Sequence, residues 1–328
     1  MPHAQEMLEI ENLTVRLTAT EVPLIGPVSM QVRRGEILGI VGESGSGKTT
    51  LGLAIAGLLA TSLSTEGAIR LEDLDLASLS GRELRKIRGH RVTMIFQDPM
   101  NALNPVFTIG QQIEAVLRTH SMAGSSKREV RARAVELLAR VGISDTDRRH
   151  ASYPHELSGG MCQRVGIALA LATGADLIVA DEPTSALDVT VQAQIVGLLT
   201  ELVRDSNLTV IFVSHDLGLV SQLCDRVAVF YAGELIEIGS AKTVTMTPLH
   251  PYTVRLVAAS PHLEEVGTIA RGIPGAPPMP GQWSKGCRFQ DRCALRTKQC
   301  ETPQSLRHIA SADHAVRCHL ADGREALQ

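Results

Sequence analysis

The stretch Gly42-Glu43-Ser44-Gly45-Ser46-Gly47-Lys48-Thr49 decides the fold of this chain, because it fits the pattern G-x-x-x-x-G-K-[ST]. The apolar run at residues 36–41 predicts a buried strand before it, and residues 49–59 predict a helix after it. A strand, a glycine-rich turn and a helix in this order form a phosphate-binding loop. The alternative is an ordinary glycine-rich turn, which the flanking strand and helix disfavour.

Each part of this loop has an expected role. Lys48 would neutralise β- and γ-phosphate oxygens, and the hydroxyl of Thr49 would ligate Mg²⁺. The backbone N–H groups of the turn would surround the phosphates. The residues expected to bind nucleotide in this loop are Gly42, Ser44, Gly45, Ser46, Gly47, Lys48, Thr49 and Thr50.

Two acidic residues, Asp181 and Glu182, end a second apolar strand at residues 177–180. Carboxylates at a sheet edge beside a phosphate loop can hold Mg²⁺ through water and polarise an attacking water. An Asp-Glu pair at a strand end is common by itself, but Pro183-Thr184-Ser185-Ala186-Leu187-Asp188 follows this one. We therefore expect the pair to act on the same nucleotide.

Further motifs stand at fixed places along the chain, namely Gln97, Leu157-Ser158-Gly159-Gly160-Met161-Cys162-Gln163 and His215. A serine and two glycines that open a helix make a second anion site, through exposed N–H groups and the helix dipole. An ordinary N-cap by Ser158 is the simpler alternative. An ordered set of motifs across residues 42–215 is far harder to meet by chance than one short motif. The set resembles the nucleotide-binding subunit of an ABC transporter.

The resemblance implies roles for individual side chains. Asp181, together with Thr49 and Gln97, would hold Mg²⁺, and Glu182 would be the general base. Gln97 would also reach the attacking water, and His215 would contact the γ-phosphate. The expected catalytic residues are thus Glu182, His215 and Gln97.

The resemblance also implies a head-to-tail dimer. Ser158, Gly159 and Gly160 would bind the γ-phosphate of a nucleotide held by the opposing subunit, and Asp188 is expected among the nucleotide-binding residues. The family usually stacks adenine on an aromatic residue where this chain has Leu17. Adenine would then be held by apolar contact alone.

The expected fold class is α/β, a P-loop ABC ATPase core with a parallel sheet, an antiparallel β subdomain, a helical subdomain and a small cysteine-rich C-terminal module. Alternation at residues 8–17 and 28–32 predicts the antiparallel sheet, and near-helical spacing at 127–141 predicts the helical part. Frequent prolines after Gly239 predict a linker. The expected domains are 1–240, nucleotide-binding, with the helical subdomain at about 98–160; 241–285, a Pro-rich linker; and 286–328, the cysteine-rich module.

Composition and length restrict the partners. A net charge of −3 over 328 residues gives no basic excess of the kind that nucleic-acid-binding domains carry. Residues 1–7 lack the features of a signal peptide, and no run approaches the roughly 18 apolar residues of a membrane span. We expect no nucleic-acid partner, and a peripheral location at the cytoplasmic face of the plasma (inner) membrane through other subunits.

Two stretches indicate the branch of the family. The sequence from Phe96 to Pro105 and the sequence His250-Pro251-Tyr252-Thr253 resemble the dipeptide and oligopeptide importers. The resemblance implies an ATPase that energises import of di- or oligopeptides. Its partners would be a related ATPase subunit in a heterodimer, two transmembrane permease subunits and a solute-binding protein. The alternatives are the ATPase of a nickel or other small-solute importer, and a soluble ABC ATPase with no permease.

Four cysteines, Cys287, Cys293, Cys300 and Cys318, follow the spacing C-x5-C-x6-C-x17-C. In a reducing compartment such a cluster suggests metal before disulfide, and four thiolates suit tetrahedral zinc or an iron–sulfur cluster. The C-x2-C pairs of many zinc modules are missing. Reduced cysteines in a small core are a third possibility.

A similar tail in related peptide-importer ATPases is associated with a [4Fe-4S] cluster. We therefore expect [4Fe-4S], with Arg288 and Arg292 among the cations that offset its negative charge. Zinc stays the alternative, because three histidines could replace thiolates as ligands, namely His308, His314 and His319. The expected cofactors are thus ATP, Mg²⁺ and a [4Fe-4S] cluster.

Overall fold

The structure is a computed structural model that describes residues 6–185, 187–260, 272–309 and 313–323. The chain divides into two compact units. Unit 1 combines Met1–Ser78 with Ile211–Gln328, and unit 2 is Leu79–Val210. Among the described helices, none has the length and apolar character needed to cross a membrane.

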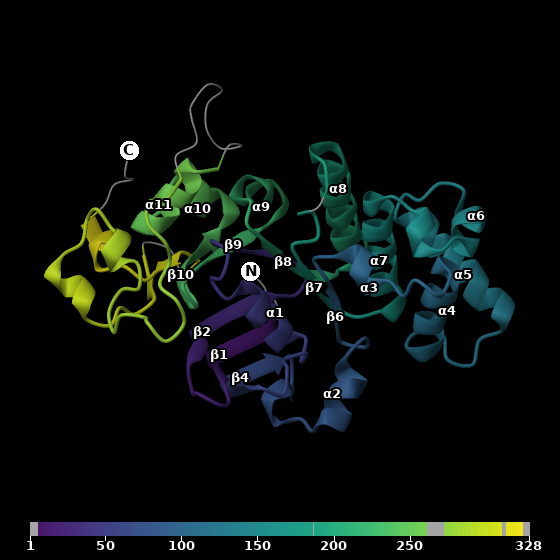
Figure 1. The fold of residues 1–328 in the computed structure, drawn as a ribbon, viewed down its shortest axis with the longest axis horizontal. Helices are drawn as coiled ribbons and strands as arrows, with labels where there is room; N and C mark the ends of the chain where they lie inside the picture. The colour runs from purple at the N-terminus through teal and green to yellow at the C-terminus, as the bar shows by residue number, and fades with distance from the viewer. Residues whose placement is uncertain (1–5, 186, 261–271, 310–312, 324–328) are drawn as a thin grey trace. The chain divides into compact units, whose positions relative to one another are not determined.

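An antiparallel sheet opens unit 1, with the strand order β2-β1-β4-β5. Ile10 in the middle of β1 lies opposite Met30 of β2 and Ile69 of β4, and all three side chains are buried. Figure 1 shows β1 between β2 and β4. The alternating pattern thus predicted this sheet correctly. Its strands are β1 (Glu6–Leu17), β2 (Pro23–Arg33), β4 (Leu63–Leu71) and β5 (Leu74–Asp75).

A second group of strands in unit 1 has the order β11-β12-β10-β9-β3. The central pair, β3 and β9, is parallel, and every residue of β3 is buried. Buried on both faces, β3 needs a continuous apolar sequence, and it leads into the glycine-rich turn and helix α1 (Lys48–Ile55). The strands are β3 (Ile37–Val41), β9 (Arg226–Tyr231), β10 (Glu234–Ser240), β11 (Arg307–His308) and β12 (Ala315–Val316).

Short helices complete unit 1, and two of them lie in the segment expected to be a linker. Pro251 stands in the first turn of α11, where its missing N–H group costs no hydrogen bond. Prolines therefore did not exclude helices from residues 241–258, while 261–271 lie outside the described residues. The helices are η1 (Leu76–Ser78), α9 (Leu217–Leu223), α10 (Ala241–Met246), α11 (Pro251–Ala258), η3 (Gln290–Arg292), η4 (Lys298–Glu301) and η5 (His319–Gly323).

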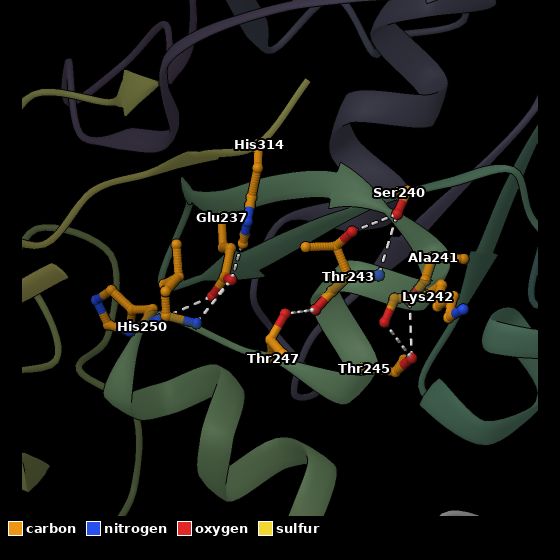
Figure 2. A network of polar contacts seen from close by, with 10 residues as sticks. Glu237, Ser240, Ala241, Lys242, Thr243, Thr245, Thr247, His250 and His314 are labelled. Carbon is orange, nitrogen blue, oxygen red and sulfur yellow. Dashed lines mark hydrogen bonds and ion pairs between the residues drawn. The ribbon is translucent and has the colours of Figure 1, made fainter. Parts of the chain in front are cut away.

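A fully buried carboxylate, Glu237 of β10, fixes the start of α11 (Figure 2). Its two oxygens accept hydrogen bonds from the backbone N–H groups of Leu249 and His250, both at 2.9 Å. The ring of His314 approaches the same carboxylate, with Nε2 2.8 Å from Oε1. His250 in turn caps α11, since its Nδ1 accepts from the N–H of Tyr252 at 3.0 Å. Tyr252 is therefore held at a defined place.

The C-terminal segment joins the strands of unit 1 rather than forming a sheet of its own. β12 pairs with β10, placing Val316 opposite Glu237, and the N–H of Arg317 donates to the carbonyl of Ile236 at 2.7 Å. A separate cysteine-rich module at 286–328 stays a prediction, and so do the other domain boundaries. Residues 310–312 and 324–328 lie outside the described part of the chain.

Unit 2 is mainly helical, and it carries the parallel strand pair β6 and β7. Helices α4, α5, α6 and α7 pack together (Figure 1). Thr108 and Ser126 begin α4 and α5 with capping boxes, which satisfy the free N–H groups of their first turns. Strand β8 (Thr209–Ser214) begins in unit 2 and ends in unit 1. The elements are α2 (Gly81–Ile87), β6 (Val92–Ile95), α3 (Pro99–Ala102), α4 (Ile109–Thr119), α5 (Lys127–Arg140), α6 (Thr146–Ala151), η2 (Pro154–Glu156), α7 (Gly159–Thr173), β7 (Leu177–Asp181) and α8 (Val189–Ser206).

Candidate functional site

The glycine-rich loop between β3 and α1 has a backbone that only glycine adopts easily. Gly45 and Gly47 have φ values of 76° and 95°, in the left-handed region. Gly42 has a φ of 156°, and a Cβ atom there would lie 2.1 Å from the carbonyl oxygen of Phe230. The turn places the N–H groups of the first turn of α1 next to the loop, where they can bind phosphate.

Lys48 lies folded into this loop, with only 5% of the residue exposed. Its Nζ donates to the carbonyl oxygens of Gly42 at 2.8 Å and Glu43 at 3.0 Å. Ser44 and Gly45 are exposed, so the loop faces solvent there, and Thr49 is exposed while Thr50 is half-buried. An ammonium at this place can reach phosphate oxygens bound by the loop.

Unit 2 contains the acidic pair, at the end of β7. Asp181 is buried, and Glu182 has a φ of 44°, which is unusual for a residue with a side chain. The Nε2 of Gln97, which follows β6, donates to Oε2 of Glu182 at 2.9 Å. Parallel pairing of β6 with β7 brings the two strand ends together. The structure thus joins two of the three residues expected to be catalytic.

The N-terminus of α7 carries Ser158, Gly159 and Gly160. Ser158 is the N-cap, and its Oγ accepts from the N–H of Met161 at 3.3 Å. A Cβ atom on Gly159 would meet no other atom within 4 Å, so its backbone is open on that side. A Cβ on Gly160 would lie 2.9 Å from the side chain of Val191. The N-cap and an accessible helix terminus are therefore both present.

Asp188 and His215 lie at the starts of two other helices. Asp188 is exposed and caps α8, its Oδ1 accepting from the N–H of Val191 at 3.0 Å. His215 is exposed after β8, one residue before Asp216, which caps α9. The glycine-rich loop and His215 belong to unit 1, whereas the acidic pair and the α7 terminus belong to unit 2. The individual roles of these residues stay predictions.

The four C-terminal cysteines line one small cavity in unit 1, together with His250 and Arg317. Cys300 and Cys318 are buried, and Cys287 and Cys293 are half-buried. Burial raises the pKa of the Cys287 thiol to about 12. Among the described residues, no three His, Cys, Asp or Glu side chains are close enough to share one metal ion.

The loop geometry, the two ordered carboxylates and the mixed α/β architecture define a nucleotide-hydrolysing protein of the P-loop class. Residues 25–185 match the family described as ABC transporter, and residues 236–300 match the oligopeptide/dipeptide transporter C-terminal region.

Relatives that align with nearly the whole chain extend this match beyond the two family regions. The oligopeptide transport ATP-binding protein AppD of Bacillus subtilis is 42% identical over 98% of this chain and 99% of its own length. The dipeptide transport ATP-binding protein DppD of the same organism is 43% identical over 98% of this chain and 96% of its own. The ATP-binding cassette MJ0796, solved as a dimer in a post-hydrolysis state bound to ADP and Pi, has a TM-score of 0.65. It is 31% identical and covers 72% of this chain and 99% of that one.

The chain therefore belongs to the ATP-binding proteins of ABC transporters for oligopeptides and dipeptides, and it is an ATPase. This finding confirms the family and the activity that the motifs predicted. The cassette fold is confirmed as well.

Sequence reasoning missed the surroundings of Glu43. Arg292, one of the cations expected to offset the charge of a cluster, forms an ion pair with this residue of the glycine-rich loop. Arg288 likewise donates to the backbone carbonyls of Ala232 at 2.6 Å and Gly26 at 2.7 Å. A run of arginines beside cysteines carries no sequence signal for such contacts.

Proposed function

We propose that this chain hydrolyses ATP to energise the import of dipeptides or oligopeptides. The observation that carries the proposal is the match of the oligopeptide/dipeptide C-terminal region, which lies in the same chain as a complete nucleotide-binding loop. An ATPase subunit does not ordinarily select the solute, so the substrate class follows from the family.

In this proposal each side chain has the role in ATP hydrolysis that the family resemblance implies. Thr49, Gln97 and Asp181 offer hydroxyl, amide and carboxylate oxygens, the donors that Mg²⁺ prefers, and bound Mg²⁺ would neutralise charge on the phosphates. Glu182 accepts a proton from the attacking water, and Gln97 orients this carboxylate through the 2.9 Å hydrogen bond. His215 contacts the γ-phosphate.

The N-terminus of α7 is the second phosphate-binding element in this proposal. Its free N–H groups would bind the γ-phosphate held by an opposing subunit, so we propose a head-to-tail dimer with a related ATPase chain. ATP binding would close this dimer, and hydrolysis would reopen it. A Cβ atom on Gly159 would meet no atom within 4 Å among the described residues, so this helix terminus has room for a phosphate of the opposing subunit.

Exposed apolar side chains support docking on membrane permeases. Five of the large exposed apolar residues of the described chain fall within unit 2, namely Phe96, Met100, Val106, Phe107 and Tyr153. Val106 is 73% exposed. A permease interface would cover such side chains on docking. We therefore propose a peripheral position at the cytoplasmic face of the plasma (inner) membrane, held by two permease subunits that receive solute from a binding protein.

ATP hydrolysis by the purified complex in proteoliposomes tests this function. The solute-binding protein would be present, with a panel of short peptides and of nickel chelates. Stimulation by peptides is expected. A response to chelates alone would move the substrate to a metal complex, and failure to assemble with any permease would favour a soluble ABC ATPase.

The four cysteines of the C-terminal segment match in number the thiolate ligands of an iron–sulfur cluster. A [4Fe-4S] cluster is held by one thiolate on each of four irons, so its ligands surround a group larger than a single ion. In the structure all four cysteines line one small cavity. We propose that Cys287, Cys293, Cys300 and Cys318 bind [4Fe-4S], with zinc as the alternative. The group would stabilise this segment by joining its four thiolates.

Replacing Cys287 by serine is expected to remove the iron, because a cluster that loses one of four thiolates is no longer fully held. The measurement is iron and acid-labile sulfide per protein after anaerobic purification, with zinc determined in parallel. Cys224→Ala is the matched control, since this buried cysteine lies outside the cavity. Unchanged metal content in Cys287→Ser would exclude Cys287 as a ligand, and zinc without sulfide in the native protein would favour zinc.

A further inference from the structure

The C-terminal segment contacts the phosphate-binding loop through a partly buried ion pair. Arg292, next to Cys293, holds the carboxylate of Glu43 with two hydrogen bonds, Nη1 to Oε2 at 2.6 Å and Nη2 to Oε1 at 3.0 Å. The side chain of Arg292 is only 6% exposed, and that of Glu43 is 26% exposed. A two-point contact with a planar guanidinium fixes the direction of the carboxylate as well as its position.

Arg292 is itself held in place. Its Nε donates to the carbonyl oxygen of Pro274 at 2.8 Å, and its Nη2 donates to that of Ile273 at 3.0 Å. Its Nη1 lies 3.2 Å from the hydroxyl oxygen of Tyr231. With all three guanidinium nitrogens engaged, the side chain has little freedom to move away from Glu43.

Glu43 is held through its backbone too, on both sides of its α-carbon. Its N–H donates to the hydroxyl oxygen of Tyr252 at 2.9 Å, and its carbonyl oxygen accepts from Lys48 Nζ at 3.0 Å. Tyr252 is fully buried and lies against Tyr231 and Phe289, with ring centroids 4.7 Å and 5.4 Å away. Glu43, which accepts a hydrogen bond from Lys48, is thus held in place by Arg292 and Tyr252.

We propose that Arg292 is a positioning residue for the phosphate-binding loop, which acts through Glu43 to keep Lys48 and the loop N–H groups ready for the phosphates of ATP. This inference rests on the proposed ATP-binding role of the loop. Arg292 touches no reacting atom. Its effect therefore lies in the affinity for nucleotide, because a loop that is already ordered pays less entropy on binding.

Arg292→Gln in the full-length chain is expected to raise the Kd for ATP about tenfold, within the range usual for coupling between linked sites. Glu43→Gln should have a similar effect, and the double variant should be no worse than either single variant, because both remove one pair. Arg292→Lys keeps the charge but not the two-point contact, so it should restore only part of the affinity. Calorimetric titration with Mg-ATP measures all four.

Arg296→Gln is the matched control. This arginine lies four residues further on, is 45% exposed and pairs with Asp291 and Glu301 of its own segment. The Kd of the Arg296→Gln variant for ATP should equal that of the wild type. In the assembled complex, Arg292→Gln should raise the KM for ATP and leave kcat within about twofold, because it acts on binding rather than on the chemical step.

Several results would overturn the inference. These are an unchanged ATP Kd in Arg292→Gln or in Glu43→Gln, additive losses in the double variant, and an equal loss in Arg296→Gln. If Arg292→Gln does not fold, Glu43→Gln decides, since glutamine has nearly the size of glutamate. A wild-type chain that binds no ATP would instead contradict the proposed function, so the two failures can be told apart.

Discussion

Glu182→Gln is expected to lower the turnover of ATP by about 10²- to 10⁴-fold, the usual contribution of a general base. The amide keeps the size of the carboxylate and can still accept a hydrogen bond from Gln97, but it cannot take a proton from water. The unusual backbone of Glu182, with a φ of 44°, directs this side chain at the end of β7 and should be retained. ATP binding should therefore persist, and the complex should hold unhydrolysed ATP in a closed dimer.

Turnover and bound nucleotide are measured on the same complex, with the corresponding glutamate of the partner ATPase also replaced if that subunit hydrolyses ATP. Glu201→Gln is a suitable control, because Glu201 is exposed along α8 and lies away from the end of β7. Turnover at the wild-type rate in the Glu182 variant would exclude Glu182 as the base. Loss of ATP binding along with turnover would indicate a disturbed fold instead.

Local motifs predicted the parts of the site that are continuous in sequence. The buried strand before Gly42 was predicted correctly, and the helix predicted at residues 49–59 begins at Lys48 and ends at Ile55. The contact between Gln97 and Glu182 joins two distant motifs, and it follows from the parallel pairing of β6 with β7. Motif order could suggest that the two residues act together, but only strand pairing gives their hydrogen bond.

Other features could not be predicted because they depend on contacts between distant segments. Glu43 and Arg292 are 249 positions apart, and neither residue type is unusual in its local sequence. The positive φ of Glu182 could not be predicted, because this position is not a glycine or asparagine, the residues that most often adopt one. The prolines after Gly239 did not indicate the short helix α11, because composition does not distinguish a proline in the first helical turn from one that ends a helix.

For the cysteines, the sequence predicted a shared site but not the group that it binds. Their number and clustering predicted one common site, and the structure places all four around one cavity. Their spacing does not select the group bound there, because thiolates of similar spacing serve zinc and iron–sulfur clusters alike. Of the arginines expected to offset cluster charge, Arg288 donates to the backbone carbonyls of Ala232 and Gly26, and Arg292 pairs with Glu43 of the glycine-rich loop.

Lys48→Ala is expected to weaken ATP binding by at least about 100-fold, which corresponds to about 2.7 kcal/mol. In the structure its ammonium donates to the carbonyl oxygens of Gly42 and Glu43, both of which are in the loop that would surround the phosphates. Charge-assisted hydrogen bonds contribute about 1.5–3 kcal/mol each, so loss of the ammonium removes contacts to phosphate and leaves the loop without its central cation. Lys48→Arg should not restore binding, because a planar guanidinium does not fit a site where the lysine is only 5% exposed.

Thermal unfolding with and without Mg-ATP measures this effect. A ligand at about 100 times its Kd stabilises the wild-type protein by about 2.7 kcal/mol, and the Lys48 variant at the same ATP concentration should gain less than about 0.5 kcal/mol. Lys86→Ala is the control, since Lys86 is exposed on α2 and its loss should leave the ATP-induced shift intact. A full shift in Lys48→Ala would mean that the backbone N–H groups of the loop bind ATP without the lysine. The stability of each variant without ATP separates this outcome from misfolding.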